Sequence, residues 1–163
     1  MHILINKNYL IYNKYKVKCA IGKRGIGYKK KEGDLITPKG KFKIKYILYR
    51  KDRVPNLQSK LKKIKIHKNM GWCDDPKSSF YNKLIKFPFN FNAEKLYKKD
   101  NTYDIILVLS FNSNPIKIGK GSAIFIHVAK NDYSHTLGCI AVSKKHLKKI
   151  CKIVNEKSIV DIS

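Results

Sequence analysis

Short stretches in which apolar and polar residues alternate dominate the first third of the chain. Three of them run over His2–Ile5, Tyr9–Tyr12 and Tyr15–Ile21, and the asparagine and lysine residues between them are typical of turns. A fourth, FKIKYILYR from Phe42 to Arg50, alternates along its length and predicts a half-buried strand. Alternation places successive side chains on opposite faces of a sheet. We therefore expect a fold built mainly of β-strands.

Other segments are more continuously apolar or have helical spacing. YDIILVLSF from Tyr103 to Phe111 and SAIFIHV from Ser122 to Val128 predict buried strands, and SIVDI from Ser158 to Ile162 predicts a closing strand. Ser143 is a favourable helix N-cap. After it comes an apolar stripe with lysines on the opposite face, formed by Leu147, Ile150, Cys151 and Val154. The pattern predicts a mostly β domain with one or two helices and places Cys151 in its core.

Two polar or irregular segments interrupt this pattern. The glycine- and lysine-rich stretch 22–41 matches neither the P-loop nor the dinucleotide-binding glycine spacing, so we interpret it as a surface loop. The stretch WCDDPKSSFYNKLIKFPFNF, residues 72–91, is rich in aromatic residues, prolines and asparagines, and predicts an irregular insertion.

The composition limits the classes of protein to consider. A chain of 163 residues with 43% hydrophobic residues has the size and apolar content of one globular domain, which we take as residues 1–163. The formal net charge of +25 favours an anionic partner such as a wall polymer, a membrane surface or nucleic acid. Nearly all of the cations are lysines spread along the chain, whereas nucleic-acid readers favour arginine. We therefore expect no specific nucleic-acid partner, and the sequence does not indicate an oligomeric state.

The four cysteines and the amino terminus bear on location. The cysteines have no CxxC pairing and no zinc-ribbon spacing, and they are too sparse for a disulfide scaffold. The first 18 residues lack the long apolar core and cleavage site of a signal peptide. No apolar run approaches the length of a membrane span.

The stretch IFIHVAKNDYSHTLGCIAVS, residues 124–143, carries the candidate chemistry. A free cysteine is most often a small buried hydrophobe, and a histidine on a strand is most often structural. However, Cys139 follows Gly138 directly, and a turn-forming loop separates both from His127. That loop allows His127 and Cys139 to meet as an acid-base partner and a thiol nucleophile. The N–H groups of Gly138 and Cys139 are then candidates for an oxyanion hole.

The same residues resemble a known family. GSAIFIHVA followed by TLGCIAVS is similar to the histidine strand and Gly-Cys motif of the YkuD-type L,D-transpeptidases. KKKEGDLITPKGKF, WCDDPKSSFYN and AEKLYKKDNTYDIILVLSFN resemble further blocks of that family in the same order. Together these blocks cover most of the chain from about residue 22 onward.

The resemblance implies a fold, a reaction and a set of residues. The family has a β-sandwich-like catalytic domain without a metal or organic cofactor. Its members attack a peptidoglycan stem tetrapeptide through a cysteine, release D-alanine, and transfer the acyl group to an amine as a 3–3 cross-link. Water as the acceptor gives an L,D-carboxypeptidase instead. Carried over, Cys139 is the nucleophile, His127 the general base and acid, and Val128 supplies the carbonyl that orients the histidine ring.

The match has departures and the sequence has rival interpretations. Many family members carry arginine two residues after the nucleophile and a small residue or histidine two before it, where this chain has Ala141 and Leu137. The family's chemistry predicts a cell-envelope or periplasmic location, with the basic surface as a contact for anionic wall polymer. A zinc site formed by His127, His135, Cys139 and Cys73 with Asp74 is a rival interpretation, but these residues have no recognisable zinc-site spacing. A basic binding module for an anionic polymer or nucleic acid, without catalysis, stays open as an alternative.

Several residues are candidates for the wall of a substrate groove. They flank the catalytic segment or belong to the tryptophan–acidic cluster at residues 72–75, and they are Gly121, Ser122, Thr136, Trp72 and Asp74. The Asp-Asp-Pro sequence in that cluster favours a turn anchored by Trp72. The alternative is a groove wall in which a carboxylate meets an amine of the substrate.

Overall fold

The computed structural model describes all 163 residues, and strands make up most of the regular structure. The elements in chain order are β1 (His2–Asn6), β2 (Tyr9–Tyr12), β3 (Tyr15–Ala20), β4 (Ile26–Gly27), β5 (Thr37–Pro38), β6 (Gly40–Tyr49), β7 (Lys63–Lys65), β8 (Met70–Cys73), β9 (Leu84–Lys86), β10 (Ala93–Lys95), β11 (Ile105–Leu109), β12 (Phe125–Val128), β13 (Ile140–Val142), α1 (Lys144–Ile153) and β14 (Ile159–Ile162). This content confirms the predicted mostly β fold, in which one or two helices were expected and one is present.

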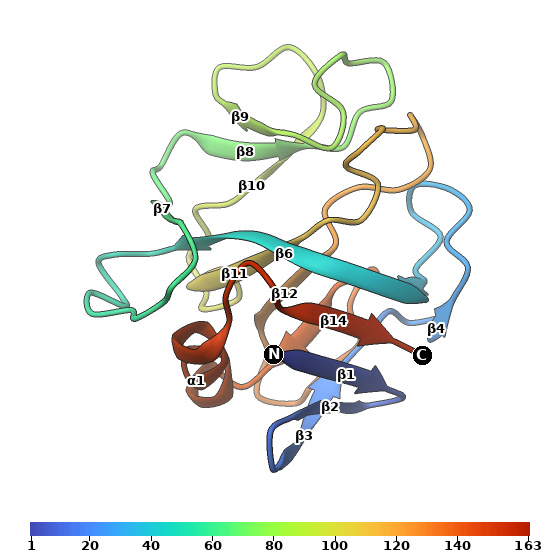
Figure 1. Ribbon diagram of the computed structural model, residues 1–163. Coiled ribbons are helices and arrows are strands. Elements are labelled where there is room, and N and C mark those ends of the chain that lie inside the picture. The colour runs from blue at the N-terminus through green and yellow to red at the C-terminus, as the bar shows by residue number, and fades with distance from the viewer.

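The largest sheet closes on itself. Its strands follow the order β11-β12-β13-β3-β2-β1-β14-β6-β7, and β6 pairs with β11 as well. The long strand β6 makes this closure possible because its first half pairs with β14 and its second half pairs with β11. The enclosed space holds the larger core cluster, to which α1 also contributes. Figure 1 shows β6 and β11 crossing the middle of the molecule, with β14, β1, β2 and β3 below them.

A second core lies on the outer face of β6, β11 and β12. Along β11, Ile105, Leu107 and Leu109 belong to the enclosed core, and Ile106 and Val108 belong to the outer one. Burial on both faces explains why this strand is apolar at every position, because neither face is left to solvent.

A small sheet of strand order β10-β8-β9 covers that outer core. It lies above β6 in Figure 1. The prediction of an irregular insertion over residues 72–91 was therefore wrong in part. Trp72 belongs to strand β8, is buried, and packs edge-on against Phe125 with ring centroids 5.1 Å apart. Proline and asparagine mark the turns between these strands rather than a lack of strands.

The segment 22–41 also differs from the predicted surface loop. It contains β4 and β5, which pair in parallel, and it buries Asp34 and Thr37. Asp34 accepts hydrogen bonds from the backbone N–H groups of Lys30, Lys31 and Ile36. These contacts replace a regular ladder, so the segment can bury polar groups without leaving them unpaired.

The helix α1 follows the predicted pattern. The Ser143 side chain accepts a hydrogen bond from the His146 N–H, which confirms the N-cap. Leu147, Ile150 and Cys151 are buried, as the stripe predicted. No helix of this chain has the length and hydropathy that crossing a bilayer requires.

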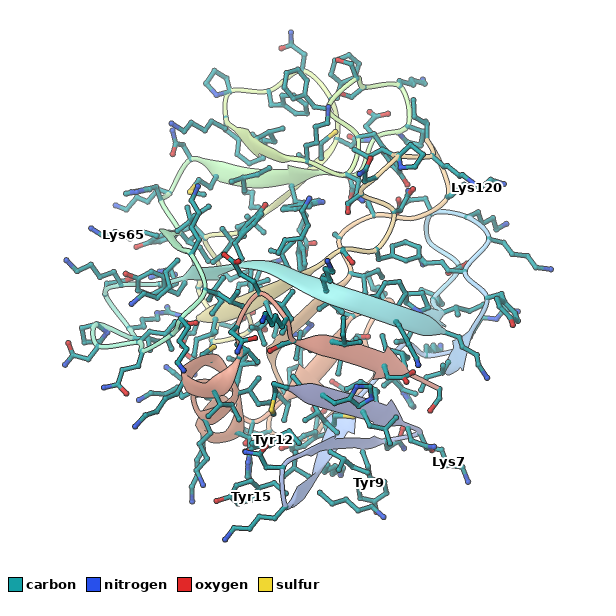
Figure 2. All side chains as sticks on the ribbon, viewed as in Figure 1. Lys7, Tyr9, Tyr12, Tyr15, Lys65 and Lys120 are labelled. Atoms are coloured by element: carbon teal, nitrogen blue, oxygen red, sulfur yellow. The ribbon has the colours of Figure 1, made fainter.

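The lysines are distributed over the whole surface. Figure 2 shows Lys7, Lys65 and Lys120 extending from well-separated parts of the molecule, and all three residues are exposed. The distribution of lysines therefore does not identify one face of the molecule as a binding surface.

Candidate functional site

A cleft of about 560 Å³ opens beside β12 and the loop that leads into β13. The residues singled out in the sequence that line it are Cys139, His127, Gly138, Ser122, Thr136, Asp74, His135, Leu137 and Ala141. Segment 22–41 contributes Lys29 and Glu32, and the turn before β11 contributes Tyr103. Residues far apart in the chain thus converge on one concave surface, the usual setting of a binding or catalytic site.

Strand pairing brings the histidine and the cysteine to this cleft. β12 and β13 are parallel neighbours, with His127 opposite Ala141. Cys139 directly precedes β13, so its thiol lies beside the start of β12. The Cys139 thiol donates to the Ala123 carbonyl at 3.0 Å, and the Phe125 N–H donates to the sulfur at 3.4 Å.

His127 is held in one orientation. Its Nδ1 lies 3.0 Å from the Val128 carbonyl oxygen, which can only accept, so Nδ1 carries the proton. The basic nitrogen is then Nε2. The ring packs edge-on against Tyr103, with centroids 5.4 Å apart, and the Tyr103 hydroxyl donates to Glu94 at 2.8 Å. Burial lowers the pKa of His127, which favours the neutral imidazole that a general base requires.

The thiol is protonated in this resting arrangement. Burial raises the pKa of Cys139 to about 12, and the hydrogen bond from the Phe125 N–H offsets this only in part. His127 and Cys139 line the same cleft but form no hydrogen bond with each other. The thiol must therefore turn from the Ala123 carbonyl toward a base before it becomes a nucleophile.

A tight turn positions Cys139. The Thr136 hydroxyl donates to the Cys139 carbonyl at 2.6 Å and accepts from the Gly138 N–H at 3.1 Å. Gly138 has a φ of +144°, and a Cβ there would lie 3.0 Å from the Ile36 carbonyl oxygen, so only glycine fits. Of the two proposed oxyanion-hole donors, the Gly138 N–H is thus occupied in the resting structure, and the Cys139 N–H has no acceptor within the chain.

Segment 22–41 forms hydrogen bonds with the turn that holds Cys139. The Thr37 hydroxyl accepts from the Gly22 N–H and donates to the Gly138 carbonyl, each at 2.8 Å. Deeper in the same segment, Lys29 and Asp34 form an ion pair of 2.6 Å, and 3% and 4% of their side-chain surfaces are exposed. These contacts join a segment near the amino terminus to the cysteine turn more than a hundred positions later.

The remaining groove candidates lie in different places. Ser122, Thr136 and Asp74 line the cleft. Gly121 does not line it: the residue is buried and its N–H donates to the Tyr81 hydroxyl. Trp72 does not line it either, because the indole is buried against Phe125 and donates to the Asn82 side chain at 3.0 Å. The predicted Asp-Asp-Pro turn is present just after β8, where the Asp75 carboxylate accepts from the Lys77 N–H.

The sequence did not reveal several polar residues of the cleft. Tyr103 was interpreted only as the start of an apolar strand, and Glu94 and Glu32 carried no motif of their own. Their one signal was membership in the blocks that resemble the family. Outside the cleft, Arg50 is buried, paired with Asp52, and stacked on Tyr97. No three histidine, cysteine, aspartate or glutamate side chains are grouped so that they could hold a metal ion.

The fold and cleft agree with a comparison to protein families. Residues 2–162 match the family model YkuD, described as the L,D-transpeptidase catalytic domain. The match spans nearly the whole chain, so this protein belongs to the YkuD family and is an enzyme of the L,D-transpeptidase type. A search of curated proteins gives no match to the chain.

Proposed function

We propose that this protein acylates Cys139 with a peptidoglycan stem tetrapeptide, releases D-alanine, and transfers the acyl group to an amine. The observation that carries the proposal is the shared cleft: parallel strands bring His127 and Cys139 to one surface, and the histidine keeps a free Nε2 there. Family membership supplies the substrate class, since YkuD domains act on peptidoglycan stem peptides.

The first half of the reaction forms a thioester. His127 Nε2 takes the thiol proton, and the sulfur attacks the carbonyl carbon of the third stem residue. The Cys139 N–H, which has no acceptor within the chain, is available to the oxyanion. The C–N bond to D-alanine then breaks, and the imidazolium returns its proton to the leaving amine.

The second half releases the acyl group. An amine attacks the thioester, a new amide bond forms, and the C–S bond breaks. The proton lost from the amine passes through His127 to the departing thiolate. When water attacks instead, the product is a tripeptide and the enzyme acts as a carboxypeptidase. A cell-envelope location follows from the polymeric substrate of this proposal.

The test is release of D-alanine from a disaccharide-tetrapeptide, measured together with the amide and tripeptide products. Wild type and Cys73→Ala are expected to release D-alanine, since Cys73 is buried in β8 outside the cleft. Cys139→Ala is expected to release none. D-alanine release by folded Cys139→Ala at the wild-type rate would contradict the proposal.

A further inference from the structure

One wall of the cleft is acidic in a chain that is otherwise strongly basic. Of the 11 acidic residues in the sequence, four line this cleft: Glu32, Asp74, Glu94 and Asp100. The net charge of +25 makes such a concentration of carboxylates unusual for this surface. A negative wall within a positive molecule attracts a small cation locally while the surrounding surface attracts anionic polymer.

Three lysines also line the cleft, but none of them pairs with Glu32 or Asp74. Lys29 is paired with Asp34, which is buried in segment 22–41, and Lys98 lies 3.2 Å from Glu94. The charges of Lys98 and Lys130 help to lower the pKa of Asp100, after its hydrogen bonds with Thr102. Glu32 and Asp74 therefore form no ion pair with a lysine.

Neither Glu32 nor Asp74 is neutralised by a partner within the chain. Glu32 accepts its side-chain hydrogen bond from the uncharged Tyr81 hydroxyl. The Asp74 carboxylate has no ion pair and no hydrogen bond from another side chain. Both carboxylates can thus accept hydrogen bonds from a ligand that enters the cleft.

A second observation points to a ligand at the same wall. Ser122 is 5% exposed and lines the cleft, and its hydroxyl oxygen is the one buried side-chain polar atom without a hydrogen-bond partner. It lies beside the Tyr81 phenol, which donates to Glu32 and accepts from the Gly121 N–H, but it is not in hydrogen-bond geometry with that phenol. A buried hydroxyl without a hydrogen-bond partner costs free energy, and a ligand that forms a hydrogen bond with it removes that cost.

The donors and acceptors at this wall define the ligand. Carboxylates and a hydroxyl can accept hydrogen bonds, whereas a primary ammonium offers three donors and no acceptor. Glu32, Asp74 and Glu94 line the same cleft, so one ligand in it meets several carboxylates. Burial together with the charges of Glu32 and Glu94 raises the pKa of the Asp74 carboxyl, and a bound cation would favour its charged form. The Cys139 thiol donates to the carbonyl of Ala123, the residue after Ser122, so a cation held beside Ser122 is near the thiol.

We propose that Glu32, Asp74 and Ser122 bind the protonated primary amine of the acyl acceptor and hold it beside the thioester on Cys139. This inference rests on the proposed function. The bound ammonium gives one proton to a wall carboxylate and from there to water, and the neutral amine attacks the thioester. The N–C bond forms, the C–S bond breaks, and the second proton passes through His127 to the thiolate. Holding the amine here favours transfer over hydrolysis.

The experiment measures the ratio of amide product to hydrolysis product for each acyl-enzyme that forms. The cationic acceptor is a diaminopimelate-containing tetrapeptide, and the uncharged one is hydroxylamine. Asp74→Asn is expected to lower the ratio about tenfold for the cationic acceptor, the size of one charge-assisted hydrogen bond, and to leave the hydroxylamine ratio unchanged. Asp161→Asn, which removes the same charge from a partly exposed position in strand β14 outside the cleft, is expected to change neither ratio.

A second variant covers the case in which Asp74→Asn fails to fold. Ser122→Ala removes an oxygen that is in hydrogen-bond geometry with no group of the chain, so it should fold and still lower the ratio for the cationic acceptor several-fold. Equal losses with both acceptors, no loss with either, or a loss confined to thioester formation would overturn the inference. Absence of any thioester in wild type would instead overturn the proposed function, and this inference with it.

Discussion

Replacing Asp34 with asparagine should destabilise the segment that supports the cysteine turn. The Asp34 carboxylate pairs with the Lys29 ammonium and accepts three backbone N–H groups, and both side chains are almost fully buried. The Asp34→Asn substitution keeps the shape of the side chain and one acceptor oxygen but removes the charge. The Lys29 ammonium is then left buried without its counterion, which is the costly arrangement for an ion pair.

Two estimates give the size of the expected loss in the free energy of unfolding. Removing one partner of a buried ion pair costs about 3–5 kcal/mol. Burial by itself raises the pKa of Asp34, but the hydrogen bonds from Lys29 and the backbone lower it from 3.8 to about 2. That net shift corresponds to about 2 kcal/mol of stability. Because the folded-state pKa is the lower one, this contribution is complete above the unfolded pKa and is lost as the pH falls toward 2. We expect a loss of about 2–4 kcal/mol in the free energy of unfolding at neutral pH.

The assay is urea unfolding of wild type, Asp34→Asn and Asp161→Asn, at neutral pH and again at acidic pH. Asp161 pairs with Lys41 at 3.6 Å on the surface, so its variant should lose less than about 1 kcal/mol. The difference between wild type and Asp34→Asn should shrink with acidification, and the Ile36 amide should exchange faster in the variant because it bonds Asp34. Similar losses in the two variants, or a difference that does not depend on pH, would refute the reasoning.

Three further predictions concern the turn, the base and the core. Thr37→Val leaves the Gly138 carbonyl and the Gly22 N–H unpaired, so it should lower the free energy of unfolding in urea by about 1–3 kcal/mol and slow acylation. Thr37→Ser keeps the hydroxyl and should retain both the stability and the acylation rate of wild type. Equal behaviour of the two variants would contradict this prediction. Burial lowers the pKa of His127 below 6.5, so the acylation rate should stay constant as the pH falls to 6.5 and decline only below it. A midpoint above 6.5 in a pH–rate profile would exclude His127 as the general base. Leu147 is fully buried in α1, so Leu147→Ala should lower the free energy of unfolding by about 2–5 kcal/mol and leave the acylation rate constant unchanged. A stability loss below about 1 kcal/mol would show that α1 packs differently.

Local patterns were sufficient to predict most of the large sheet and the helix. Alternation identified β1, β2, β3 and β6, because each presents a different environment on its two faces. Ser143 and the stripe after it identified α1. These signals are local in the chain, so a single sequence carries them.

The small sheet and segment 22–41 depend on contacts that no local pattern records. Trp72 is in a strand because it packs on Phe125, more than fifty positions away, and the prolines nearby concealed that strand. Asp34 is buried because its carboxylate satisfies an ammonium and three amides, and a lysine-rich stretch does not indicate such an arrangement. Tertiary contacts outweighed turn propensity in both places.

The candidate site was predictable in its reactive pair and in part of its lining, because Ser122, Thr136 and Asp74 line the cleft as expected. Gly138 and Cys139 stand out in the sequence because glycine precedes a thiol, and His127 stands out as one polar residue in an apolar strand. The partners that surround them, such as Tyr103 and Glu94, come from other elements and resemble ordinary strand or surface residues. The resting hydrogen bond from the thiol to the Ala123 carbonyl also depends on geometry that the sequence does not encode locally.

The most direct test of the account is to locate the acyl group on the protein. Wild type is incubated with a disaccharide-tetrapeptide, trapped at acidic pH, and analysed by intact mass and then by peptide mapping. The chain has four free cysteines, of which Cys19, Cys73 and Cys151 are buried and only Cys139 is partly exposed. We predict an adduct that lacks one D-alanine on the Cys139 peptide alone. An adduct on another residue, or none on a folded protein with a free Cys139 thiol, would contradict the account.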